Sequence, residues 1–344
     1  MINAKRFDVA VAVGDDVSEA AKPVEKLLTI ICQMGYRLIC VEIRTTSLSK
    51  PNRERLEGLL GLIGNIEMVY PVQFKVTVRS NFCDMDKKTI RMMARKNIGL
   101  QLFADNLDFP ANKPLKALKP YKGKANLLRF NAATGMDRHG CIEIRTGFAG
   151  LGDALVFNVW DFDIEKTTKM FSEWFFDTKG VHVDYFSQCL KVVLFDANMD
   201  VCRYNSCLGK TLHMNGNGDL SFCLNDTSAV IANINDVESY VDIFENGLFL
   251  EVLDKTKQFR NKCKNDCGYF QKCQGGCPMN LNNMEDKDTG KCDGNGFITL
   301  LGNVEKTLKN FFSENISLDN INPLARKDIL NAIAINSSIG KILA

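Results

Sequence analysis

The chain has 344 residues, of which 45% are hydrophobic and 24% are charged, a composition typical of soluble globular proteins. Its 43 basic and 41 acidic residues give a net charge of +2, so charge provides no basis for expecting nucleic acid or a membrane surface as a partner. The length is sufficient for two domains. The sequence has no apolar run of the ~18 residues that a membrane-spanning helix requires and no signal-peptide pattern near Met1, so we expect a cytoplasmic protein.

Short segments rich in Val, Ile, Leu and Phe recur through the first 200 residues and predict strands buried on both faces, as in a parallel sheet. These segments are residues 7–13, 37–43, 74–80, 99–105, 126–132, 154–160 and 190–195. Between several of them, residues 17–35, 53–65 and 86–99 have the periodic apolar positions of helices, and we expect Ser18 to cap the first helix and Gly35 to end it. Alternating strands and helices favour an α/β fold with parallel strands, either open or closed into a barrel.

Residues 106–125 interrupt this alternation. The segment contains three prolines and five lysines, and it predicts an exposed loop. The lysines (Lys113, Lys116, Lys119, Lys122 and Lys124) either attract an acidic partner or only solvate the surface, and local charge runs usually do the latter.

The thirteen cysteines are unevenly distributed. Five lie in or beside apolar stretches of the first 200 residues, and we expect them to be buried structural thiols: Cys32, Cys40, Cys83, Cys141 and Cys189. The other eight fall between Cys202 and Cys292. Because we expect a reducing cytosol, metal binding is a better explanation for this cluster than a disulfide framework.

The spacing of the eight clustered cysteines is Cys202-x4-Cys207-x15-Cys223 and then Cys263-x3-Cys267-x5-Cys273-x3-Cys277-x14-Cys292. Zinc and [4Fe–4S] clusters both accept four thiolates, and spacing alone does not distinguish them. The glycines Gly268, Gly275 and Gly276 favour a bulky cluster, since glycine lets the backbone approach sulfur closely. Residues 208–222 predict a hairpin with its turn at NGNGD, which would place cysteines at both ends of the hairpin.

This pattern, with GGCP at residues 275–278, resembles the SPASM domain, a C-terminal extension of radical SAM peptide-modifying enzymes that holds two auxiliary [4Fe–4S] clusters. The resemblance implies one cluster bound by Cys202, Cys207, Cys223 and Cys277, and a second bound by Cys263, Cys267, Cys273 and Cys292. The chain departs from the family in having three residues between Cys263 and Cys267, where two are usual.

The N-terminal half resembles the radical SAM partial β/α barrel without its reaction centre. The family places a C-x3-C-x2-C motif after the first strand, and no such motif occurs upstream of Cys202. Thr45, Thr46 and Ser47 stand about where the family has the Gly-Gly-Glu-Pro motif that holds the SAM amino group. The resemblance therefore implies a degenerate barrel over residues 1–200, a SPASM domain over 201–305 and a helical tail over 306–344. It also implies that no SAM is bound or cleaved.

Three functional hypotheses follow. The resemblance favours a SPASM protein that acts in the maturation of ribosomally synthesised peptides (RiPPs), as in cassettes with an ATP-grasp ligase, by binding a precursor peptide or a partner peptide-modifying enzyme. The second hypothesis is that the chain is itself an enzyme, either an oxidoreductase that uses the two clusters as an electron relay or a barrel that carries out new chemistry. The third is that it is a zinc-binding interaction module. No catalytic residue is predicted, because the histidines His139, His182 and His213 lie far apart in sequence and no Walker-type loop is present.

The last predicted element is a helix within residues 323–343. Its apolar residues near helical spacing are Leu324, Ile329, Leu330, Ile333 and Ile335. We expect this helix either to pack on its own domain, as terminal helices commonly do, or to dock a partner.

Overall fold

The computed structural model describes residues 6–13, 17–81, 86–104, 117–121, 128–132, 156–159, 164–178, 183–197, 209–223, 230–273 and 297–335. The chain divides into two compact units. The first comprises Met1–Phe103, Pro110–Arg129 and Ser206–Lys255, and the second comprises Ala104–Phe109, Phe130–Asn205 and Thr256–Ala344. Within the described residues, no helix is long and apolar enough to cross a membrane.

The first unit is built on a mainly parallel sheet. Strands β1 (Arg6–Ala12), β2 (Leu38–Arg44), β3 (Gln73–Asn81) and β4 (Gly99–Ala104) pair in parallel with their sequence neighbours. On the other side of β1, β7 (Thr211–Met214) also pairs in parallel, and β8 (Asp219–Ser221) and β9 (Val230–Asn233) then add in antiparallel pairing. Over the described residues of this unit, the strand order is β4-β3-β2-β1-β7-β8-β9.

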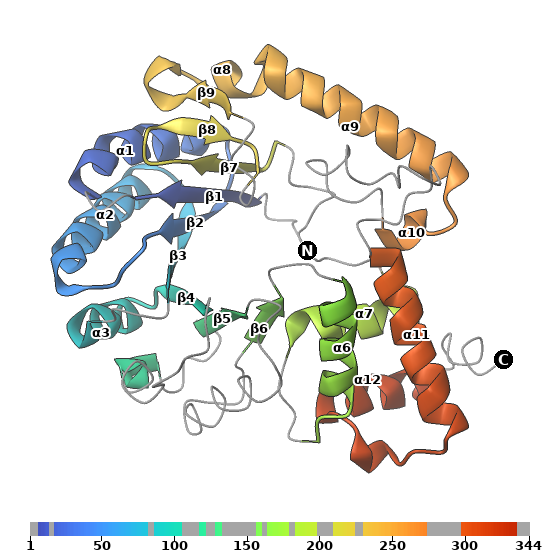
Figure 1. Ribbon diagram of the computed structural model, residues 1–344. Coiled ribbons are helices and arrows are strands. Elements are labelled where there is room, and N and C mark those ends of the chain that lie inside the picture. The colour runs from blue at the N-terminus through green and yellow to red at the C-terminus, as the bar shows by residue number, and fades with distance from the viewer. Residues whose placement is uncertain are drawn as a thin grey trace. The chain divides into compact units, whose positions relative to one another are not determined.

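Three helices connect the first four strands: α1 (Val17–Gln33), α2 (Lys50–Val69) and α3 (Lys87–Arg95). Because the strands are in sequential order and parallel crossovers are right-handed, all three helices must lie on the same face of the sheet, as Figure 1 shows. The buried side chains Val9, Val41, Val76 and Leu100 belong to the strand residues that face these helices. We call the opposite face the inner face of the sheet.

Local signals explain where these helices begin and end. The carboxylate of Asp86 caps α3 by accepting a hydrogen bond from the Thr89 amide at 2.8 Å. Gly35 ends the turn after α1 in the left-handed region at φ 74°, as predicted. Helix α1 begins at Val17, so Ser18 lies inside the helix and the prediction that it is the cap is wrong.

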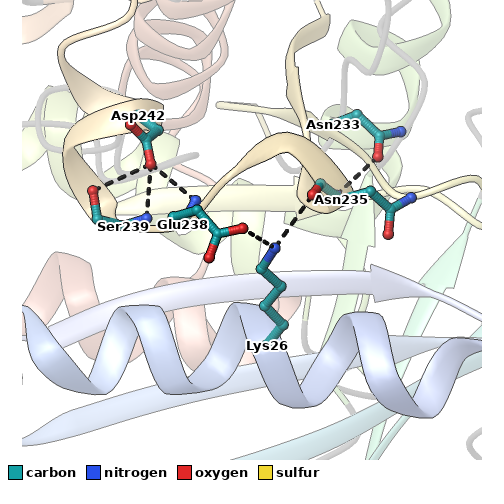
Figure 2. Close-up of polar contacts among 6 residues, drawn as sticks. All are labelled: Lys26, Asn233, Asn235, Glu238, Ser239 and Asp242. Carbon is teal, nitrogen blue, oxygen red and sulfur yellow. Dashed lines mark hydrogen bonds and ion pairs between the residues drawn. The ribbon is translucent and has the colours of Figure 1, made fainter.

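The segment after β9 is fastened to α1 by polar contacts (Figure 2). It contains the short helices η3 (Ile234–Asp236) and α8 (Tyr240–Phe244). The Lys26 ammonium donates to the Asn235 carbonyl and to the Glu238 carboxylate, both at 3.3 Å. The Asp242 carboxylate accepts from the backbone amides of Glu238 at 2.9 Å and Ser239 at 2.8 Å, and these bonds lower the pKa of Asp242. The hairpin and its extension are therefore tied to the first helix of the chain.

The second unit contains the helices α6 (Ile164–Phe175), α7 (Asp184–Phe195), α11 (Phe297–Ser313) and α12 (Pro323–Ala334). Aromatic side chains form its core, with the Phe171 and Phe186 rings 5.7 Å apart and the Phe175 and Phe311 rings 5.6 Å apart, both edge to face. The Asn322 amide, just before α12, donates to the Phe175 carbonyl at 2.8 Å. The four helices are thus joined by ring contacts and by a backbone bond.

Six of the seven predicted strands are confirmed as β1 to β4, β5 (Leu128–Ala132) and β6 (Val156–Val159), whereas the strand predicted at 190–195 is the C-terminal half of α7. Phe186, Leu190, Val193 and Leu194 are all buried on α7, and only Lys191 in this half is well exposed. A short apolar run fits a buried helix as well as a buried strand, so the sequence pattern could not separate the two.

The prediction of an exposed loop over residues 106–125 is wrong for residues 117–121, the part of this segment that the structure describes. Residues 117–121 end in the short helix η1 (Lys119–Tyr121), and Ala117, Leu118 and Tyr121 are buried. The Tyr121 hydroxyl donates to the Ile98 carbonyl at 2.8 Å, which satisfies the buried polar group. Lys119 is exposed, and the other four lysines are outside the described residues.

The predicted terminal helix is confirmed as α12, but its buried stripe differs from the predicted one. Ala325, Asp328, Ile329 and Ala332 are its buried residues, and the Ser187 hydroxyl of α7 contacts the Asp328 carboxylate at 3.5 Å. The predicted apolar residues Leu330, Ile333 and Ile335 are exposed. The helix therefore packs on its own unit through small residues and Ile329, and residues 336–344 are outside the described part of the chain.

Candidate functional site

Two of the predicted metal ligands lie one helical turn apart: Cys263 is in the last turn of α9 (Gly247–Asp266), and Cys267 follows directly after this helix. The Cys267 amide donates to the Cys263 carbonyl at 2.9 Å, so the two residues have the i, i+4 relation of a helical turn. Side chains at i and i+4 share one face of a helix, and both thiols are partly exposed. The three-residue spacing that departs from the family pattern thus directs both thiols to the same side.

The third cysteine of this group, Cys273, ends the short helix α10 (Phe270–Cys273). The neighbouring Lys272 ammonium contacts the carboxylates of Asp196, just after α7, at 3.4 Å and Glu305, on α11, at 4.0 Å. These ion pairs hold the end of α10 against the helices of its own unit. The position of the Cys273 backbone is therefore fixed by the second unit's packing.

Cys223 follows β8 and lies at the end of the confirmed hairpin of β7 and β8. Its carbonyl accepts from the Ser221 hydroxyl at 3.4 Å, and the thiol is partly exposed. The remaining predicted ligands, Cys202, Cys207, Cys277 and Cys292, lie outside the described residues, where the two predicted ligand sets would be completed. Among the described residues alone, no group of three potential ligands is assembled. The thiols that are described suit a thiolate-ligated cluster, since none of Cys223, Cys263 and Cys267 is in a disulfide or deeply buried.

The predicted structural thiols have a different environment. Cys32 and Cys189 are buried, as expected, and Cys40 is half-buried, while Cys83 and Cys141 are outside the described residues. Burial raises the pKa of Cys32 to about 11, and it also raises the pKa of Cys40. A metal ligand must be a thiolate, so these raised pKa values argue against a ligand role for the two residues.

The inner face of the sheet carries a cluster of charged side chains that the sequence reasoning missed. The Arg44 Nε donates to the Glu42 carboxylate at 2.7 Å, and the Arg79 guanidinium lies 3.5 Å from the same carboxylate oxygen. These side chains are 17% (Arg44), 23% (Glu42) and 19% (Arg79) exposed. One carboxylate is therefore shared by two guanidinium groups that solvent can still reach.

His213 of β7 lies on the same face. It pairs with Ala10 of β1, which in turn pairs with Glu42 of β2, so the three residues form one row across the sheet. The His213 side chain is only 3% exposed, and its Nδ1 has no hydrogen-bond partner among the described residues. Burial and the charges of Arg44 and Arg79 lower the pKa of His213 from 6.5 to about 4, so the imidazole is neutral at pH 7. We call Glu42, Arg44, Arg79 and His213 the inner-face cluster.

A signal for this cluster was present in the sequence. In "CVEIR" (residues 40–44) and "KVTVR" (residues 75–79), polar residues occupy alternate positions between buried Val and Ile. Alternation of this kind places the polar residues on one face of a strand. The expectation that these strands are buried on both faces was therefore wrong for β2 and β3, whose inner face is polar and partly open.

Thr45 and Ser47, predicted to replace the SAM-binding motif, form a local turn after β2. The Thr45 hydroxyl donates to the Ser47 carbonyl at 3.1 Å, and the Thr45 amide donates to the Arg79 carbonyl at 2.9 Å. Asn52 of α2 donates its side-chain amide to the same Ser47 carbonyl at 3.1 Å. These groups thus support the connection between β2 and α2.

Comparison with solved structures identifies the architecture. The chain matches native anSMEcpe with bound AdoMet and a Cp18Cys peptide at a TM-score of 0.64 and 15% identity, covering 91% of this chain and 99% of that chain. It also matches native anSMEcpe with bound AdoMet at a TM-score of 0.63 and 15% identity, again covering 91% of this chain and 99% of that chain. The chain has a radical SAM-type partial-barrel fold. No family model and no curated protein sequence matches it.

Within this fold, the connection between β1 and α1 is short. Only residues 13–16 separate the two elements, and the sequence there, Val-Gly-Asp-Asp, contains no cysteine. The expectation that no cysteine follows the first strand thus applies to the whole connection between β1 and α1.

Proposed function

We propose that this chain is an iron–sulfur SPASM protein that binds a precursor peptide, or the enzyme that modifies it, during maturation of a ribosomally synthesised peptide. The observation that supports this best is the likeness to anSMEcpe over 91% of the chain, because that protein was solved with a bound peptide. The eight cysteines between Cys202 and Cys292, in their order and spacing along the sequence, supply the ligand sets that the SPASM resemblance requires.

In this proposal, Cys202, Cys207, Cys223 and Cys277 hold one [4Fe–4S] cluster, and Cys263, Cys267, Cys273 and Cys292 hold the other. Fully ligated clusters supply electron transfer or structural cross-linking when bound. The partly exposed thiols of Cys263 and Cys267 on one helical face, and the ion-paired anchor beside Cys273, are consistent with the second set. The clusters would then stabilise a peptide-binding fold.

We further propose that the protein does not cleave SAM. The short, cysteine-free connection after β1 supports this, and so do the hydroxyl groups of Thr45 and Ser47, which make local hydrogen bonds. An enzyme with new chemistry in the barrel is the alternative with a specific observation in its favour, since the inner-face cluster brings two guanidinium groups, a carboxylate and an imidazole to one face.

The test is direct binding of candidate precursor peptides. Peptides encoded by short reading frames beside the gene would be synthesised with a fluorophore, and their anisotropy measured against anaerobically purified protein. We expect saturable binding of one peptide and none of its sequence-scrambled control. Turnover of such a peptide by this protein alone would contradict the non-catalytic role, and equal binding of peptide and scrambled control would contradict peptide recognition.

A further inference from the structure

We propose that Lys264 raises the reduction potential of the iron–sulfur cluster whose ligands include Cys263 and Cys267. Its ammonium group would favour the reduced form of the cluster, because reduction adds negative charge beside it. The inference rests on the proposed function, since it requires that this cluster is bound, and it adds a residue of the chain that makes the cluster easier to reduce.

The last turn of α9 places Lys264 beside the two thiols. The Cys267 amide donates to the Cys263 carbonyl at 2.9 Å, so the helical turn continues as far as Cys267. Residues three and four apart are neighbours on a helix surface, and Lys264 precedes Cys267 by three residues. At 3.6 residues per turn, Lys264 is roughly 60° from Cys267 around the helix axis, whereas Asn265 is roughly 160° from both cysteines. Lys264 and Asn265 therefore lie on different sides of the helix.

The positive charge of Lys264 is not neutralised along the helix. None of the residues three or four positions away from it is acidic: these are Arg260, Asn261, Cys267 and Gly268. The acidic residue nearest in sequence is Asp266, and residues two apart do not face each other on a helix. Lys264 is exposed, and within the described part of the chain it has no ion-pair partner. Its charge is therefore available to act on the neighbouring thiolates.

The end of α9 makes this positive charge relevant to reduction. The carbonyl groups at a helix C-terminus carry roughly half a negative charge, which disfavours the addition of an electron to a cluster bound there. One lysine ammonium carries a full positive charge, so at a similar distance it more than offsets the helix end. Because water and salt screen an exposed charge, we expect Lys264 to change the equilibrium between oxidised and reduced cluster by only about threefold.

A lysine in the last turn of a helix also stabilises the helix itself. Lys264 is the basic residue in the last turn of α9, where its charge interacts favourably with the C-terminal carbonyl groups. This second effect would change the free energy of unfolding, but a purely structural role would leave the potential of the cluster unchanged. A measurement of the midpoint potential therefore distinguishes the proposed role from helix stabilisation.

The experiment is potentiometry of the anaerobically purified protein with its clusters. Dithionite is added stepwise, and the reduced clusters are detected by electron paramagnetic resonance. Cys223→Ser removes a proposed ligand of the other cluster, so the signal that remains identifies the cluster of Cys263 and Cys267. Lys264→Gln should lower the midpoint potential of this cluster by roughly 30 mV, the equivalent of a threefold change, because tenfold corresponds to 59 mV for one electron. Salt at about 1 M should reduce this difference.

Two further variants separate the position of the charge from the loss of the side chain. Lys264→Arg keeps the charge in place and should keep the wild-type potential. The double variant Lys264→Gln/Asn265→Lys has the wild-type net charge, but its lysine lies on the other side of the helix, so it should keep the lowered potential. Lys264 and Asn265 are both exposed, so we expect all of these variants to fold.

Equal midpoint potentials in the wild type and Lys264→Gln would overturn this inference and leave the proposed function intact. The same decrease in Lys264→Arg would also overturn it, and so would full recovery in the double variant, because the charge or its position would then have no effect. Protein that contains no iron–sulfur cluster would overturn both this inference and the cluster assignment on which it rests.

Discussion

Lowering the pH should destabilise the folded protein through His213. Its pKa in the folded state is about 4, below the ordinary value of 6.5, because burial and the charges of Arg44 and Arg79 oppose protonation. The unfolded chain therefore binds a proton more readily between these two values. The stability that depends on neutral His213 is fully present above pH 6.5, is lost progressively as the pH falls to about 4, and does not change further below that.

The size of the effect follows from the two pKa values. Between pH 7.5 and pH 4.5, the wild-type protein should lose roughly 2.5 kcal/mol of unfolding free energy through this one residue. Asp86, Asp219 and Asp242 have pKa values lowered from 3.8, so their contributions are still largely present at pH 4.5. Between pH 7.5 and pH 4.5, the change in unfolding free energy due to His213 is therefore separated from the contributions of the described carboxylates whose pKa values are lowered.

The assay is urea unfolding followed by far-ultraviolet circular dichroism under anaerobic conditions, at pH 7.5 and pH 4.5, for the wild type and His213→Gln. The two proteins differ only at residue 213, so the contributions of all other groups cancel in the difference. We expect the wild type to lose roughly 2.5 kcal/mol more than the variant. Equal losses in the two proteins would refute the inference that His213 is held neutral by its surroundings.

Three further predictions concern the clusters, the reaction and the terminal helix. Anaerobically purified protein should contain about eight irons and eight sulfides, Cys277→Ala about half of each, and Cys83→Ala the full amount; stoichiometric zinc without sulfide would disprove the cluster assignment. Reduced protein incubated with SAM should form 5′-deoxyadenosine only at the level of a no-protein control, because no cysteine lies between β1 and α1; formation above that level, abolished by Cys→Ala variants, would reveal an iron with an open site. Ile329→Ala on the buried face of α12 should lower the unfolding free energy by roughly 3 kcal/mol, whereas Ile333→Ala on its exposed face should change it by less than about 0.5 kcal/mol; equal effects would contradict the observed orientation of the helix.

The alternation of strands and helices could be predicted from the sequence because each element carries its own periodic signal. Strands β1 to β4 and helices α1 to α3 lie within a few residues of their predicted bounds. The prediction for 190–195 failed because five of these six residues are apolar, and a run this short fits a buried helix as well as a buried strand. The other polar residues of α7, Asp184, Ser187 and Gln188, precede the segment, so the helical spacing that they form with Lys191 was not included in it.

The parallel pairing of β1 with β7 could not be predicted, since it joins segments about 200 residues apart and no local signal records it. The same pairing brings His213 onto the face that carries Glu42, Arg44 and Arg79. The cysteine ligands, by contrast, were proposed from the order and spacing of eight cysteines and from the resemblance to the SPASM domain that this pattern carries, because metal sites in proteins recur with fixed local patterns. A site whose residues are brought together by strand pairing is thus much harder to predict from sequence than a site whose residues follow a local spacing pattern.

The docking of β7 on β1 also has a consequence for synthesis in the cell. Strand β1 ends at Ala12, and the strand that covers its open edge begins at Thr211. At roughly 5–20 residues per second, a ribosome needs on the order of 10–40 s to make the intervening chain. Throughout that interval the backbone amides and carbonyls along this edge of β1 have no partner strand, and an uncovered edge readily pairs with other chains. Successful production of the protein therefore depends on protecting its first strand until the hairpin of β7 and β8 has left the ribosome.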